Sequence, residues 1–182
     1  MHSIENKQIV LLYALGRSGS NLLQSLIDDH DEVLMIPTII WYYYDWEFKL
    51  KKYRKNPEKF INQFFTKSSF LIDWYTSGLG VNKDKKFDLK KDEIKDELLG
   101  AVKDKKYITR KDFILLLHLA YSKIFDIDIS RKKIILLHHH FPINGFGYNY
   151  FNDNLSTNFN GVDLFENLLE DFPHIKISGL CT

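Results

Sequence analysis

Residues 9–27 read IVLLYALGRSGSNLLQSLI, and this run carries the strongest structural signal in the chain. Its first six residues, 9–14, are all hydrophobic, which is typical of a strand buried on both faces. Two glycines and two serines follow and predict a tight loop over residues 15–20. The leucines and isoleucine of residues 22–27 recur at helical spacing and predict a helix that ends near His30. The run therefore predicts a strand, a turn and a helix in direct succession.

The same alternation continues through the rest of the chain. Further strands are expected at residues 33–36, 134–137 and 175–180, and helices at residues 57–65, 92–102, 110–125 and 162–171. Thr109 is a favourable N-cap for the third of these helices. This order predicts an α/β fold with three layers, a P-loop-like arrangement in which helices cover both faces of a central parallel sheet. No linker divides the chain, so a single domain is expected over residues 1–182.

The bulk composition is ordinary for a globular protein and excludes several classes. Of the 182 residues, 45% are hydrophobic and 27% are charged, with a formal net charge of +1. Such a balance does not indicate a nucleic-acid partner. No apolar stretch is long enough to span a membrane, and a single cysteine, Cys181, fits a reducing compartment. We therefore expect a cytoplasmic protein without a membrane span.

Two lysine-rich stretches, near residues 49–55 and 83–91, need no special function. Both mix charge signs with neighbouring acidic residues, and the net charge of the whole chain is low. Solvated surface is the simplest interpretation of each stretch.

The loop after the first strand has the chemistry of an anion site. The N–H groups at the start of a helix are unpaired, and the helix dipole adds partial positive charge there. Gly16 and Gly19 allow the backbone to turn tightly. Ser18 and Ser20 supply hydroxyl donors, and Arg17 supplies a guanidinium suited to phosphate or sulfate. These residues predict a phosphate or sulfate site.

Two common nucleotide-binding motifs do not match this loop. Only two residues separate Gly16 from Gly19, and no Lys-Ser or Lys-Thr pair follows, so the loop is not a Walker A motif. It is not the G-x-G-x-x-G dinucleotide motif either. The predictions of a nucleotide kinase and of a dehydrogenase therefore lose their main support.

The segment from Leu12 to Leu26 resembles the 5′-phosphosulfate loop of the sulfotransferase family. In that family a strand leads to a basic residue, Ser, Gly and a Ser or Thr pair, and then to a helix that opens with leucines. Asn21 departs from the usual Thr but keeps a side-chain donor. The resemblance implies an enzyme that uses 3′-phosphoadenosine 5′-phosphosulfate (PAPS) as co-substrate. It implies that the cofactor is bound by Gly16, Arg17, Ser18, Gly19, Ser20 and Asn21, with Arg17 also stabilising charge on the leaving group.

Three consecutive histidines, His138 to His140, follow the strand expected at residues 134–137. Alternation along a strand would place His138 and His140 on one face and His139 on the other. A metal site requires three or four converging ligands, and no partner spacing is visible, so no metal is expected. Packing or exposure at a strand end is a second interpretation.

The catalytic interpretation of this cluster comes from the resemblance. His140-Phe141-Pro142 resembles the His-Leu-Pro of many sulfotransferases, whose histidine is the general base. An imidazole suits the removal of a proton from an attacking hydroxyl near neutral pH. The resemblance therefore makes His140 the catalytic base. His138 stands where cytosolic members often carry Lys.

The resemblance ends before the family's second cofactor segment. Residues 172–182 resemble the approach to the segment that binds the 3′-phosphate, and the arginine of that segment would come next. The domain is accordingly expected to be incomplete. A catalytically inactive, P-loop-like nucleotide-binding module remains the alternative to an active sulfotransferase. The acceptor is expected to be a small molecule or a glycan, and the aromatic residues around 41–46 are predicted either to stack on it or to pack in the core.

Overall fold

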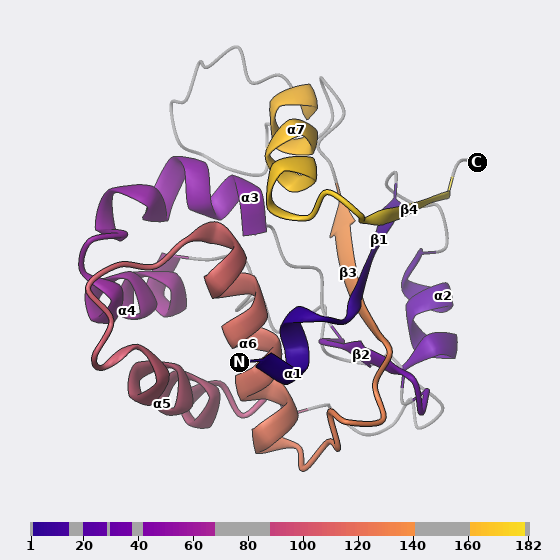
Figure 1. Cartoon of the computed structure of the whole chain (residues 1–182), viewed down its shortest axis with the longest axis horizontal. Coiled ribbons are helices and arrows are strands. Elements are labelled where there is room, and N and C mark those ends of the chain that lie inside the picture. Colours follow the sequence, from indigo (N-terminus) through magenta and orange to yellow (C-terminus); the bar gives the residue numbers. More distant parts are fainter. Residues whose placement is uncertain are drawn as a thin grey trace.

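A computed structural model describes residues 2–14, 20–28, 30–37, 42–67, 88–140 and 161–180. Four strands form one sheet in this part of the chain: β1 (Gln8–Ala14), β2 (Val33–Met35), β3 (Ile134–His140) and β4 (Lys176–Leu180). All the pairings are parallel, and the strand order is β2-β3-β1-β4. The predicted α/β class with a parallel sheet is confirmed (Figure 1).

The five predicted helices are present, together with short helical segments at residues 2–5 and 42–53 that were not predicted. They are α1 (His2–Glu5), α2 (Ser20–Ile27), α3 (Tyr42–Asp45), α4 (Pro57–Lys67), α5 (Lys91–Val102), α6 (Arg110–Ile124) and α7 (Gly161–Asp171), with a π-helical turn η1 (Trp46–Leu50) and a 3-10 turn η2 (Lys51–Tyr53) after α3. Strand β3 is longer than predicted, because all three histidines belong to it. The segments between α4 and α5 (residues 68–87) and between β3 and α7 (residues 141–160) lie outside the described residues.

The hydrophobic run of β1 is explained by burial on both faces of the sheet. Ile9 and Leu11 belong to the large core beneath α6. Leu12, which points the other way, packs with Met35 and Leu136 in a smaller cluster beneath α2. Since successive side chains of a strand point to opposite faces, only a continuous apolar run can satisfy both clusters.

Helix α6 forms the centre of the larger core (Figure 1). Its predicted N-cap is confirmed: the Thr109 hydroxyl accepts a hydrogen bond from the Asp112 N–H at 2.9 Å, and the Asp112 carboxylate accepts one from the Thr109 N–H at 3.2 Å. Phe113 packs edge-on against Phe60 and Phe64, with ring centroids 5.0 and 4.7 Å away.

Among the described residues, no helix combines the length and the apolar character needed to cross a bilayer.

The aromatic segment before α4 packs in the core where the structure describes it. Tyr43 is 3% exposed and Trp46 is 5% exposed. The Trp46 ring lies 5.3 Å from the ring of Phe60. Of the two interpretations of this segment, core packing therefore holds for Tyr43 and Trp46, while Trp41 lies outside the described residues.

Candidate nucleotide-binding site

Three strands end level with one another at one edge of the sheet. The register places Ala14, the last residue of β1, opposite His140 of β3 on one side and opposite Leu180 of β4 on the other. The predicted phosphate loop follows Ala14 directly, and α2 begins at Ser20. The predicted phosphate loop and the predicted base therefore follow from neighbouring strands at the same edge, although 126 positions separate Ala14 from His140.

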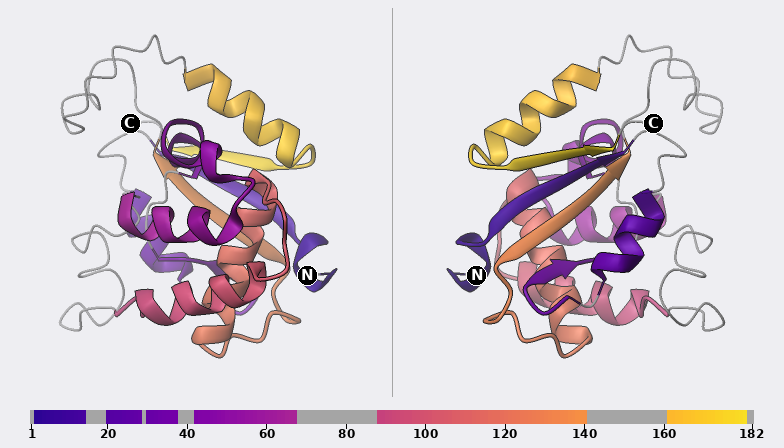
Figure 2. Two further views of the ribbon diagram at one scale, coloured as in Figure 1. Left: turned by 90° about the vertical axis from the view of Figure 1, so that its left-hand side faces the viewer. Right: turned by 90° about the vertical axis from the view of Figure 1, so that its right-hand side faces the viewer.

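The connections that leave β1 and β3 lead to opposite faces of the sheet (Figure 2). From β1 the chain passes to α2, whose Leu23 and Ile27 pack on the smaller cluster. From β3 it passes to α7, whose Leu168 belongs to the larger core on the other face. In open α/β sheets, ligands bind outside the carboxyl ends of two such neighbouring strands. The topology thus places the candidate site between Ala14 and His140, independently of any resemblance.

The start of α2 suits an anion. The helix spans Ser20 to Ile27, and its first turn carries no acidic residue that would repel a phosphate group. Its first N–H groups have no partner within the helix, and the dipole favours negative charge there. Ser20 and Asn21 open the helix, so Ser20, which was expected to end the loop, is the first residue of α2. The other predicted loop residues, Gly16 to Gly19, lie outside the described residues, as do the side chains of Ser20 and Asn21.

A buried polar pair lies between α2 and β3, one helical turn beyond the predicted loop. His138 is 3% exposed and Gln24 is 1% exposed. The His138 Nδ1–H donates a hydrogen bond to the Gln24 Oε1. The packing interpretation therefore holds for His138, and the amide oxygen pairs with this ring when Nδ1 carries a proton.

Sequence reasoning did not single out Gln24. The sequence does contain a signal for its burial: Gln24 is a polar residue on the apolar face of a short helix, directly after Leu23 and three positions before Ile27. A buried polar side chain at such a position requires a hydrogen-bonding partner. Only the pairing of β1 with β3 reveals that the partner is His138.

One atom of the Gln24 amide has no partner among the described residues. Its Nε2 is buried and makes no hydrogen bond with them. Rotation of the amide by half a turn would pair the nitrogen with His138 and leave the oxygen unpaired instead. A buried, unpaired amide group costs about 1–3 kcal/mol, so it marks a place where a further polar group would be stabilising.

The remaining two histidines differ from His138 in what the structure describes. The backbone of His139 and His140 completes β3, opposite Tyr13 and Ala14. Their side chains lie outside the described residues, so the orientation predicted for His140 stays a prediction. Within the described ranges, no three His, Cys, Asp or Glu side chains are grouped so that they could hold a metal ion.

A shallow surface hollow lies at the other edge of the sheet, away from the candidate site. It is lined by His30, Asp31, Glu32 and Arg131, next to the amino ends of β2 and β3. Its charges are already paired, since Arg131 lies 3.2 Å from Asp31 and Lys133 binds Glu32. The hydrogen bond from Lys133 lowers the pKa of the Glu32 carboxyl. This hollow is therefore an ion-paired surface rather than part of the candidate site.

Comparison of the chain with protein-family models, with curated proteins and with solved structures gave no match. We therefore infer the function from the topology of the sheet and from the residues at the carboxyl ends of β1 and β3.

Proposed function

We propose that this chain is a P-loop-like nucleotide-binding protein that transfers a sulfuryl group from PAPS to an acceptor hydroxyl or amine. One observation carries the proposal. A strand, a loop rich in Gly, Ser and Arg, and a helix follow one another, and His140 stands in register with the last residue of that strand. This arrangement supports the sulfotransferase resemblance because it brings the two matching segments to one edge of the sheet.

In this proposal the loop holds the cofactor. The N–H groups of Gly19 to Asn21 and the side chains of Ser18, Ser20 and Asn21 bind the 5′-phosphate. Arg17 stabilises the negative charge that builds on the bridging oxygen as the bond to sulfur breaks. A cation preorganised at a developing charge is commonly the largest single contribution to such a reaction.

His140 accepts the proton of the acceptor in the same step. The acceptor oxygen attacks sulfur in line and forms the new S–O bond. The bond from sulfur to the 5′-phosphate breaks, and adenosine 3′,5′-bisphosphate leaves with the electron pair. The acceptor proton passes to the imidazole, which is suited to this transfer near neutral pH. No metal is needed in this scheme.

A nucleotide-binding module without transfer activity is the second candidate. His138 occupies the position where cytosolic sulfotransferases often carry Lys, and it is buried against Gln24 rather than presented as a free cation. A site without that cation would bind the nucleotide but give less stabilisation to the leaving group.

Calorimetric titration distinguishes these candidates from an unrelated function. We expect adenosine 3′,5′-bisphosphate to bind the full chain more tightly than 5′-AMP or ATP. Equal, weak binding of all three nucleotides would support the binding module. No binding by a chain that is folded by circular dichroism would contradict both.

Replacement of Arg17 tests the transfer step. We expect Arg17→Ala to lower bisphosphate release from PAPS, with a panel of hydroxyl and amine acceptors, by about 10²-fold or more. Arg131→Ala is the matched control, because it removes the same charge at the opposite edge of the sheet. Turnover by Arg17→Ala equal to that of the control would refute the assignment of Arg17.

A further inference from the structure

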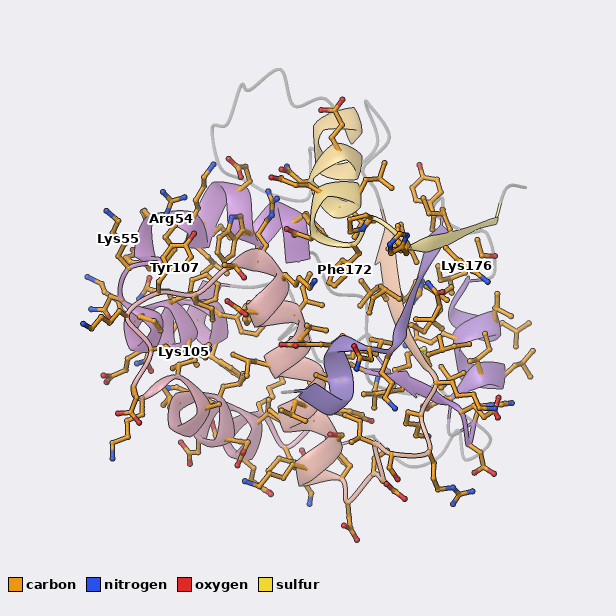
Figure 3. The ribbon with its side chains drawn as sticks, viewed as in Figure 1. Arg54, Lys55, Lys105, Tyr107, Phe172 and Lys176 are labelled. Carbon is orange, nitrogen blue, oxygen red and sulfur yellow. The ribbon has the colours of Figure 1, made fainter. Side chains whose placement is uncertain are left out.

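Two segments that are far apart in the chain form one basic surface. The first comprises residues 51–59, from η2 into α4, and the second is the connection 103–107 between α5 and α6. The Ile108 N–H donates to the Arg54 carbonyl at 3.0 Å, and the Arg54 guanidinium lies 5.9 Å from the centre of the Tyr107 ring. Figure 3 shows Arg54, Lys55, Lys105 and Tyr107 gathered on one side of the molecule.

This basic surface concentrates positive charge. Its basic residues are Lys51, Lys52, Arg54, Lys55, Lys59, Lys103, Lys105 and Lys106, and its acidic residues are Glu58 and Asp104. The surface therefore carries +6. Because the whole chain carries +1, the remaining residues together carry −5. The near-neutral composition thus conceals an uneven distribution of charge along the chain.

The positive charges of the basic surface are largely unpaired among the described residues. Lys51 forms an ion pair with Glu47, at 2.6 Å. None of the other seven cations forms an ion pair in the part of the chain that the structure describes. The ammonium groups of Lys52 and Lys59 both lie 5.3 Å from the centre of the Tyr53 ring, so two positive charges lie near the same ring. Crowded like charges are mutually destabilising, and an anionic partner would remove that repulsion.

From this arrangement we infer that the basic surface binds membranes that contain anionic lipid. Clusters of four to eight Lys or Arg residues are typical of such binding. Seven of the eight cations here are lysines, whose flexible point charges suit a fluid array of headgroups. Tyr107 is 44% exposed at the centre of the cluster, and tyrosine favours the membrane interface.

Nucleic acid is the other polyanion to consider, and the residue types favour it less. Among basic side chains, the planar fork of arginine is the one best suited to bidentate recognition of base edges. The single arginine of the basic surface, Arg54, already lies over the ring of Tyr107, so its guanidinium is engaged within the fold. Lipid headgroups require only charge at the surface, which the lysines supply.

The position of the basic surface is compatible with an open candidate site. In Figure 2, the connection between α5 and α6 lies toward the N-terminal side of the molecule, whereas β1 and β3 point away from it. A membrane docked on residues 51–59 and 103–107 would therefore leave the carboxyl ends of these strands accessible. The inference does not depend on the proposed function.

Vesicle sedimentation tests the inference on the full chain. We expect binding to vesicles of phosphatidylcholine with phosphatidylserine, no binding to phosphatidylcholine alone, and loss of binding as salt rises from about 0.1 M to about 1 M. Charge reversal of Lys52, Lys55 and Lys106 to Glu should weaken binding by at least about tenfold. Reversal of Lys7, Lys95 and Lys176, the matched control, changes the net charge equally and should change binding by less than about threefold.

Three outcomes would overturn the inference. They are failure of the unaltered chain to bind phosphatidylserine vesicles at low salt, equal loss of binding in the control triple, and tighter binding to a single-stranded oligonucleotide than to the vesicles. Circular dichroism checks that both triples are folded. If the Glu triple is unfolded, replacement of the same three lysines by Gln provides the same comparison.

Discussion

A single amide on α2 links the two parts of the candidate site. Gln24 lies one turn after the start of the helix that follows the predicted phosphate loop, and it binds His138, two residues before the predicted base. Any change at this hydrogen bond acts on both segments at once. The pair is therefore suited to hold the loop-bearing helix and the histidine-bearing strand in a fixed relation.

We expect Gln24→Leu to weaken binding of adenosine 3′,5′-bisphosphate by about fivefold, because a hydrogen bond of this kind contributes about 1 kcal/mol. Imidazole ¹⁵N NMR should show that His138 loses its preference for a proton on Nδ1. Gln24→Glu, which keeps an acceptor at the same reach, should restore that preference. Leu23→Ala, which weakens the same helix–sheet packing without touching the bond, is the control. An unchanged His138 tautomer in Gln24→Leu would contradict the positioning role.

His118 is the second buried histidine and makes folding depend on pH. It is 1% exposed within α6, and its Nδ1 lies 2.8 Å from the Ile114 carbonyl. Burial lowers the pKa of His118 to about 4, although the hydrogen bond to Ile114 acts in the opposite direction. The unfolded chain, with an ordinary histidine pKa near 6.5, therefore binds a proton more readily than the folded chain.

The stability that His118 contributes is fully present above about pH 6.5 and is lost as the pH falls toward 4. Between pH 7 and pH 4.5 we expect this residue to account for a loss of about 2–3 kcal/mol in the free energy of unfolding. His118→Gln should remove that part of the pH dependence in denaturant titrations, whereas His174→Gln, at an exposed position, should not. The same slope in His118→Gln and the unaltered chain would refute this account.

At the scale of elements, the ion pairs of Arg110, the first residue of α6, connect that helix to α7. The Arg110 side chain is 16% exposed, and it donates to Asp171 at 2.9 Å and to Glu170 at 2.7 Å. Burial alone would lower the pKa of Arg110, but the bonds to Asp171 and Glu170 outweigh it and raise that pKa. The last turn of α7 contains no basic residue, so its acidic side chains oppose the helix dipole unless a cation from elsewhere compensates.

We expect Arg110→Ala to destabilise the protein by about 2–3 kcal/mol, because it leaves Asp171 in a largely buried position without its charged partner. The loss of stability should be concentrated in α7. The substitution should therefore increase the rate of amide hydrogen exchange more in α7 than in α5. Glu170→Gln is the control: its side chain is 75% exposed, and the change should cost less than about 1 kcal/mol. Equal effects of the two changes would show that Arg110 does not fasten this helix.

At the scale of the whole molecule, charge is distributed unevenly. The basic surface carries +6 and the rest of the chain −5, so like charges repel one another locally even though the total is near zero. Such repulsion between exposed charges is screened by salt. A surface maintained for an anionic partner would therefore reduce stability slightly in the absence of that partner.

We expect Lys106→Glu to raise the melting temperature by about 1 °C at low salt, since relief of like-charge contacts gains a few tenths of a kcal/mol. The difference should disappear at about 1 M salt. Lys95→Glu, within the acidic stretch of α5, should have the opposite sign. A lower melting temperature for Lys106→Glu at low salt would show that the lysines of the basic surface do not repel one another.

Local patterns in the sequence were sufficient to predict most elements of the fold. The apolar run of β1 predicted a strand buried on both faces, and Thr109 predicted the start of α6. The aromatic segment before α4 left two interpretations open, because rings that fill a core and rings that stack on a ligand have the same composition. Packing of Trp46 against Phe60 resolved that question for the described rings.

By itself, the sequence determined which residues form strands and helices and which faces must be buried, because periodicity and capping are local properties of the chain. The tertiary structure alone decided the strand order, the register of Ala14 with His140, the hydrogen bond between Gln24 and His138, and the union of residues 51–59 with 103–107. Each of these joins segments about fifty or more residues apart. The pairing of parallel strands and the docking of helices depend on how crossover connections pack, and no local pattern records that.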